Sequence, residues 1–195
     1  MHDIEPWYGW RDYYIAEEDK KSPFYQRQYD EFVFTNKIYN HFIHPQWDFF
    51  GSETLYIKIL FVDYQQSFAL IECIGEWNDC LENDIMFLKR EIIDVLISKK
   101  IYHFVLFCDN VLNYHGDEDC YYEEWYDDIK DQEGWICFVN TFDHVLLEMK
   151  KYRLHHYVNF GQRLNEMNWR GKNPELMKEE VENIIFNNTK MIKTG

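Results

Sequence analysis

Glycine and basic residues are both scarce in this sequence. Its eight glycines form none of the phosphate-binding loops, dinucleotide fingerprints or serine elbows that mark nucleotide-dependent enzymes and hydrolases, so we expect no nucleotide cofactor. Only 20 Lys and Arg residues stand against 35 Asp and Glu, which gives a net charge of −15. That balance disfavours a broad surface for phosphate groups, so neither nucleic acid nor an anionic membrane is an expected partner.

The chain also lacks a membrane span and a recognisable cysteine framework. No run of 18 apolar residues is present, and Met1–Glu5 has neither the basic nor the apolar region of a signal peptide, so we predict a cytoplasmic protein. The five cysteines include no Cys-x-x-Cys pair and are odd in number, which disfavours a zinc ribbon or a complete disulfide set. Cys73, Cys108 and Cys137 lie in apolar runs, where we expect free core thiols.

Large rings take the place of small side chains. Aromatic residues make up 19% of the chain, whereas alanine occurs only at Ala16 and Ala69. Each buried ring removes roughly 150–250 Å² from water, so we expect a core of rings, Ile and Leu despite the high charge. The length of 195 residues suits a single domain.

Apolar periodicity predicts strands that alternate with helices. Two strands joined by a short turn form a hairpin, and buried strands and amphipathic helices follow it. The predicted elements are strands 54–64 and 67–74, helix 84–99, strands 102–108 and 135–139, helix 141–152, strand 156–160 and helix 174–190. Because strand–helix–strand units form parallel sheets, we predict an α/β fold with a mixed, mainly parallel central sheet, an edge hairpin and helices on both faces.

This prediction divides the chain into three parts. Residues 1–50 form an aromatic N-terminal cap of the same domain. Residues 51–161 form the α/β core, with an acidic excursion over 109–133, and residues 162–195 form a linker and a C-terminal amphipathic helix. Asn173 and Pro174 supply the N-cap and the first position of that helix.

Polar side chains follow three of the predicted strands. Glu76 and Asp79 follow the hairpin, Asp109 follows the next strand, and Asn140 and His144 follow the one after. In open parallel sheets, ligands gather at the carboxyl ends of strands. Our second hypothesis is therefore a metal-dependent hydrolase in which Glu76, Asp79 and Asp109 hold Mg²⁺ or Ca²⁺ and His144 carries a proton. The competing interpretation of Asp79 is that it stabilises the start of the next helix.

Segment 109–133 concentrates the negative charge. It has ten carboxylates and one lysine among 25 residues, with tyrosines and a tryptophan between them. Carboxylates packed this densely need water, a metal ion or a basic partner to neutralise them. One interpretation is a solvated loop that keeps the protein soluble. The other is a binding surface, in which residues 121–129 form a short helix that exposes its rings within a charged rim.

We favour the binding surface, because rings provide contact area at little entropic cost and the carboxylates attract a basic protein. The leading hypothesis is a protein-binding or regulatory module that engages a basic partner, as an inhibitor of a basic enzyme does. No oligomeric state is predicted. The predicted partner-binding residues are Asp117, Glu118, Asp119, Tyr121, Tyr122, Glu123, Glu124, Trp125, Tyr126, Asp127 and Asp128.

Overall fold

The computed structural model describes residues 4–30 and 32–192, with side chains up to Phe186. Its centre is a five-stranded sheet in the order β3-β4-β5-β6-β7. The antiparallel pair β3–β4 forms one edge, and the other neighbours are parallel. This is the predicted mixed, mainly parallel sheet with an edge hairpin. The strands are β3 (Leu55–Asp63), β4 (Phe68–Asn78), β5 (His103–His115), β6 (Trp135–Val139) and β7 (Val158–Phe160).

Strand β5 is longer than the sequence predicted. After a register shift, its second half continues to pair with β4, from Ile74 opposite Asn110 to Asn78 opposite His115. Backbone pairing therefore extends the strand past the apolar run that marked it in the sequence. The first residues of segment 109–133 consequently belong to the sheet.

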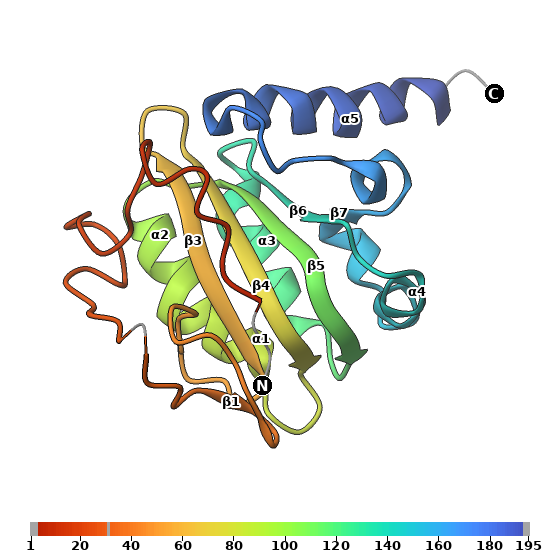
Figure 1. The fold of residues 1–195 in the computed structure, drawn as a ribbon. Helices are drawn as coiled ribbons and strands as arrows, with labels where there is room; N and C mark the ends of the chain where they lie inside the picture. Colours follow the sequence, from red (N-terminus) through yellow and green to blue (C-terminus); the bar gives the residue numbers. More distant parts are fainter. Residues whose placement is uncertain (1–3, 31, 193–195) are drawn as a thin grey trace.

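Helices cover one face of this sheet, behind the strands in Figure 1. Segments α1 (Asp84–Phe87), η1 (Leu88–Ile93) and α2 (Asp94–Ser98) follow one another as a helical stretch with a π-helical centre. Helix α3 (Cys120–Lys130) connects β5 to β6, and α4 (Asp143–Lys151) connects β6 to the short η2 (Leu154–His156) before β7. The sequence predicted helices on both faces of the sheet, and these helices confirm that prediction for one face.

The opposite face is covered by the two ends of the chain, which Figure 1 shows as the red segment crossing the strands and the blue helix above them. Trp10 from the N-terminal segment and Trp169 from the C-terminal segment pack on sheet residues such as Phe107. Helix α5 (Met177–Ile192) adds Met177 and Val181. It follows η3 (Gln162–Glu166) and η4 (Pro174–Leu176). Helices therefore lie on both faces.

A small hairpin stands beside β3 and β4. Strands β1 (Lys37–Ile38) and β2 (His41–Phe42) pair antiparallel. In the segment that follows β2, the buried side chains of Ile43 and Trp47 pack against Tyr56 and Ile74 of the sheet. Within the described residues, no helix combines the length and the apolar character needed to cross a membrane.

Candidate functional site

Asp79 lies beneath the start of the helical segment that begins with α1. It is only 4% exposed. Its carboxylate accepts hydrogen bonds from Ile85 N (2.9 Å), Trp77 Nε1 (3.0 Å), Tyr114 OH (3.1 Å) and Tyr122 OH (2.7 Å). Burial raises the pKa of Asp79 to about 7, although the bonds from Tyr122 and Ile85 favour the ionised form. The bond from Ile85 confirms that Asp79 stabilises the helix start, as the competing interpretation predicted.

Asp109 and Asn140, which follow neighbouring predicted strands, do meet. Asn140 Nδ2 donates to Asp109 Oδ1 over 3.1 Å. Two further donors to Asp109 come from the C-terminal segment: Trp169 Nε1 at 2.9 Å and Arg170 Nη1 at 2.9 Å. Arg170 Nη2 also binds the buried Glu72 at 2.9 Å, and burial raises the pKa of Glu72 to about 7. Asp109 is thus part of the contact that holds the C-terminal segment on the sheet.

Glu76, Asp79 and Asp109 do not come together as a metal site, which corrects that expectation. The rings bonded to Asp79 belong to the helix-covered face, whereas Trp169, bonded to Asp109, belongs to the opposite face. Glu76 accepts a hydrogen bond from Tyr39, which bonds to neither Asp79 nor Asp109. In the part of the chain that the structure describes, no three His, Cys, Asp or Glu side chains are placed to hold a metal ion. The cause is the length of β4 and β5, which puts Glu76 and Asp109 within paired strands, while Asp79 follows β4 and bonds to the start of the next helix.

His144, the predicted proton carrier, lies apart from these carboxylates. It is exposed in the first turn of α4. Its Nε2 atom is 2.8 Å from the backbone oxygen of Leu112, and its ring stacks on Phe142 with 5.8 Å between centroids. These contacts fix the imidazole on the surface and give no support to the metal-hydrolase hypothesis.

The ring-bearing face of α3 is turned into the core. Tyr122, Trp125 and Ile129 are fully buried, and Trp125 packs edge-on against Phe104 with 5.2 Å between centroids. The expectation that Tyr122 and Trp125 form an exposed binding face is therefore wrong. These residues form the apolar stripe of an amphipathic helix, and the sheet beneath α3 buries that stripe. The segment is a crossover helix, not a solvated loop.

One flank of α3 is neutralised by the neighbouring helix. Lys89, whose side chain is fully buried, lies 2.8 Å from Asp128 and 3.5 Å from Glu124. Arg90 binds both carboxylate oxygens of Glu124 at 2.5 and 2.8 Å, and this bonding lowers the pKa of Glu124. Burial lowers the pKa of Lys89, but its hydrogen bonds to Asp128 and Asp94 outweigh this effect and raise the pKa overall. Two of the predicted partner-binding carboxylates thus have partners inside the molecule.

The other flank of α3 keeps its charge. Glu123 and Asp127 are exposed and Asp119 is partly exposed. Among the residues that the structure describes, no basic side chain forms an ion pair with Glu123 or Asp119, and Asp127 pairs with the exposed Lys130 at 2.6 Å. Burial raises the pKa of Tyr157, and the charges of Asp119 and Glu123 raise it further.

A groove lies beside this flank. Its volume is about 670 Å³, and its walls come from α3, the sheet edge at β7 and α5. Tyr126 and Tyr157 line it with their rings 6.2 Å apart, and Phe186, which is 54% exposed, lies on the α5 side. We call Asp119, Glu123, Tyr126, Asp127 and Tyr157 the α3 surface. Asp117 and Glu118 are exposed just before it, and Tyr121 is partly buried on the neutralised flank, near Arg90.

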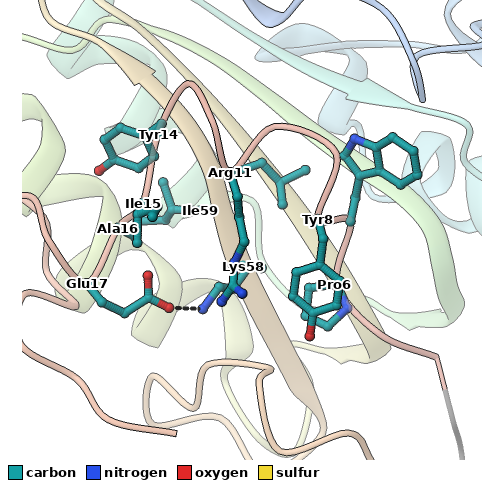
Figure 2. A pocket seen from close by; sticks show the side chains of 11 residues that line it. Pro6, Tyr8, Arg11, Tyr14, Ile15, Ala16, Glu17, Lys58 and Ile59 are labelled. Carbon is teal, nitrogen blue, oxygen red and sulfur yellow. Dashed lines mark hydrogen bonds and ion pairs between the residues drawn. The ribbon is translucent and has the colours of Figure 1, made fainter.

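The charged cavity beneath the N-terminal segment is too small for a ligand. Figure 2 shows Lys58 of β3 reaching Glu17, whose Oε1 atom lies 2.5 Å from Nζ. Lys58 also lies 3.2 Å from the buried Asp48. The cavity has a volume of about 20 Å³, which is room for about one water molecule. This cluster therefore ties the N-terminal segment to the sheet.

Sequence reasoning does not single out two basic residues, Lys89 and Arg170, that pair with carboxylates inside the molecule. Lys89 follows Leu88 in the inward stripe of its helix, and a lysine in that position is a signal that buried carboxylates lie opposite. Arg170 lies in the segment that the sequence predicts as a linker, and nothing local indicates its long-range partners. No protein-family model and no curated protein sequence matches the chain. The functional argument therefore depends on the geometry of the sites.

Proposed function

We propose that the protein is a binding module that engages a basic protein through the α3 surface and the adjoining groove. The observation that carries the proposal is a row of carboxylates, Asp119, Glu123 and Asp127, of which only Asp127 has an ion pair within the described residues, beside two tyrosines and a groove of about 670 Å³. The proposal retains the binding function predicted from the sequence but assigns it to partly different residues. Tyr126 and Tyr157, which are partly exposed, replace Tyr122 and Trp125 as the rings of the surface.

Charge distribution supports this surface over the rest of α3. Glu124 and Asp128 gain little from a further cation because Lys89 and Arg90 already bind them. Glu123 and Asp119 have no such ion pair among the described residues, so a lysine or arginine of the partner would displace only water from them. Such carboxylates accelerate association with a basic protein and orient it, and salt weakens the effect.

The groove supplies the apolar part of the proposed interface. Specific interfaces combine a desolvated centre with a polar rim, and tyrosine is enriched among the residues that contribute most to binding. Here Tyr126 and Tyr157 line the groove with their ring centroids 6.2 Å apart. A basic partner that also inserts an apolar side chain matches both features.

Charge reversal tests this proposal. The immobilised full-length protein is used to recover basic proteins from its native cell at low salt, and the affinity of each recovered protein is then measured by calorimetry. We expect Glu123→Lys with Asp127→Lys to weaken the complex at least tenfold, and we expect an increase from 50 to 300 mM salt to weaken it similarly. Asp128 is unsuitable for this test, because its substitution would also remove one of the carboxylates that pair with the buried Lys89.

The matched control is Asp12→Lys with Glu18→Lys. Both residues are exposed in the N-terminal segment, which crosses the other face of the sheet, and the pair changes the net charge by the same amount. Equal weakening by both pairs would reduce the effect to net charge alone. A complex that neither pair weakens, or that tolerates salt, would contradict the proposal.

A further inference from the structure

Another cavity, separate from the α3 surface, lies at the carboxyl-terminal halves of β4 and β5. Its volume is about 310 Å³, at the lower end of the range of ligand-sized pockets. The floor includes Ile74 of β4 and Leu112 of β5, and the β1–β2 hairpin supplies Ile38. Figure 1 shows β1 near the end of the sheet where the arrowheads of β4 and β5 lie. Parallel sheets commonly bind ligands at this end of their strands.

The walls of this cavity are anchored in the core. Ile43 is 1% exposed and Ile74 is 4% exposed, and both pack with Trp47. The Trp47 Nε1 atom donates a 2.8 Å hydrogen bond to the backbone oxygen of Ile4, which lines the cavity as well. These contacts fix the walls before any ligand arrives, and such preorganisation lowers the cost of binding.

Gly75 permits the hairpin to approach the sheet. Its φ angle is +125°, a region that residues with a side chain rarely adopt. A Cβ atom there would lie 2.1 Å from the backbone oxygen of Thr54 and 2.9 Å from Ile38 Cδ1. The close contact between hairpin and strand, and with it the apolar wall of the cavity, depends on the missing side chain.

Glu76 gives the apolar cavity one acidic group. Tyr39 OH donates to its Oε2 atom over 2.8 Å, and His115 Nε2 lies 3.6 Å from the same oxygen. Within the described part of the chain, the Oε1 atom forms no hydrogen bond, and neither does the side chain of Asn110 on the same wall. The cavity therefore offers two unused oxygen acceptors, one of them on a carboxylate, next to a group of isoleucines.

We propose that this cavity binds a small organic cation, a primary amine on a short aliphatic chain. The ammonium group would donate to Glu76 Oε1 and to the Asn110 side-chain oxygen, and the chain would lie between Ile38, Ile74 and Leu112. An ammonium has three donors and no acceptor, which suits the unused oxygens of Glu76 and Asn110. A carboxylate ligand would meet Glu76 with the same charge.

Three probes of equal length test the charge preference. Hexylamine, hexanol and hexanoate are titrated at pH 8 into the full-length protein, and the amide signals of residues 74–76 and 110–112 are followed by NMR. We expect saturable binding of hexylamine, at least about fivefold tighter than that of hexanol, with hexanoate weakest. Absence of saturable amine binding, or equal affinity for all three probes, would refute the site.

Variants locate the effect at Glu76. Glu76→Gln keeps the size of the side chain and should abolish the preference for the amine, whereas Glu53→Gln, at an exposed position before β3, should preserve it. Leu112→Arg places a cation at a residue that is 54% exposed and should weaken the amine without unfolding the protein. An unchanged amine preference in Glu76→Gln would overturn the assignment. The result is independent of the proposed function, because none of these residues belongs to the α3 surface.

Discussion

At the residue scale, this protein places ionisable groups inside its core and satisfies them with fixed donors. Asp84, which is fully buried, accepts hydrogen bonds from Ser52 Oγ at 2.5 Å, Thr54 Oγ1 at 2.9 Å and Asn78 N at 2.7 Å. Asp79 has four such donors. Each donor replaces a water molecule that the carboxylate lost on folding. Removing a donor or ionising the carboxylate therefore changes the stability of the fold.

The raised pKa of Asp79 predicts a pH-dependent contribution to stability. The folded protein binds a proton at Asp79 with a pKa of about 7, against an ordinary value of 3.8. Between these values the folded state holds more protons than the unfolded state, so this contribution is complete below pH 4 and is lost as pH rises through about 7. We expect the free energy of unfolding of the wild type, relative to Asp79→Asn, to fall by about 1–3 kcal/mol between pH 4.5 and pH 8.

Urea unfolding of both proteins at several pH values measures this difference. The comparison cancels the other titrating groups, which the two proteins share. Asp12→Asn serves as the control, because Asp12 is exposed and its variant should follow the wild type at every pH. A difference between wild type and Asp79→Asn that stays constant with pH would show that Asp79 ionises in the folded protein as it does in the unfolded chain. A wild type that gains stability relative to Asp79→Asn as pH rises would show that folding lowers this pKa, and either result would contradict the prediction.

At the scale of elements, α3 shows how one helix serves two roles. Its inward stripe of Tyr122, Trp125 and Ile129 packs on the sheet, while its outer positions concentrate negative charge. The basic residues of the neighbouring helix then divide those charges into a neutralised flank and an open one. The helix thus contributes to the core and, in our proposal, to binding, through different residues.

This division predicts that substitutions of the buried Trp125 change the stability of the fold. Trp125→Ala should lower the free energy of unfolding by about 3–5 kcal/mol, since it leaves a large cavity in the core. Trp125→Phe should cost less than about 1.5 kcal/mol, because it keeps a ring against Phe104 and removes a buried indole N–H that has no hydrogen-bond partner among the described residues. Denaturant unfolding monitored by circular dichroism measures both.

Glu123→Ala is the matched control on the same helix. It removes an exposed side chain and should change the free energy of unfolding by no more than about 0.5 kcal/mol. A Trp125→Ala protein as stable as this control would mean that the indole is not part of the core.

At the scale of the whole molecule, the two ends of the chain close one face of the sheet together. The backbone N–H of Trp7 donates to Glu72 at 2.8 Å, and Arg170 binds both Glu72 and Asp109 at 2.9 Å. Trp169 stacks on Phe107 with 3.9 Å between centroids. Strands β4 and β5 thus hold residues that are more than 160 positions apart in the sequence, which makes this face a product of long-range contacts.

Arg170 should therefore contribute to global stability. In Arg170→Ala, Glu72 remains buried and loses its cation, and we expect the free energy of unfolding to fall by about 2–4 kcal/mol, reduced from a fully buried pair because the arginine is partly exposed. Adding Glu72→Gln to Arg170→Ala should restore part of the loss, because it removes the unpaired charge. A double-mutant cycle in urea measures this coupling.

Strictly additive effects of the two substitutions would contradict the coupling. So would an Arg170→Ala protein within about 0.5 kcal/mol of the wild type. Lys151→Ala provides the comparison, since it removes an exposed ion pair with Glu148, and such pairs contribute little to stability.

The sequence by itself determined the order and type of the main elements. The alternation in the hairpin, the stripe of the first long helix and the Asn173–Pro174 start of the C-terminal helix are local signals. The structure confirms the last of them with a 2.9 Å hydrogen bond from Glu175 N to the Asn173 side chain. Local patterns suffice here because strand and helix periodicity follow from which face is buried.

Tertiary structure decided which carboxylates are buried or paired and which rings lie at the surface. Trp125 and Tyr126 are neighbours in an acidic segment, yet one is fully buried and the other lines a groove. Asp79 and Asp109 follow similar apolar runs, yet they bond to opposite faces of the sheet. The physical reason is that burial and pairing of a charge depend on partners distant in the chain, such as Lys89 for Asp128 and Arg170 for Glu72, which no local pattern encodes.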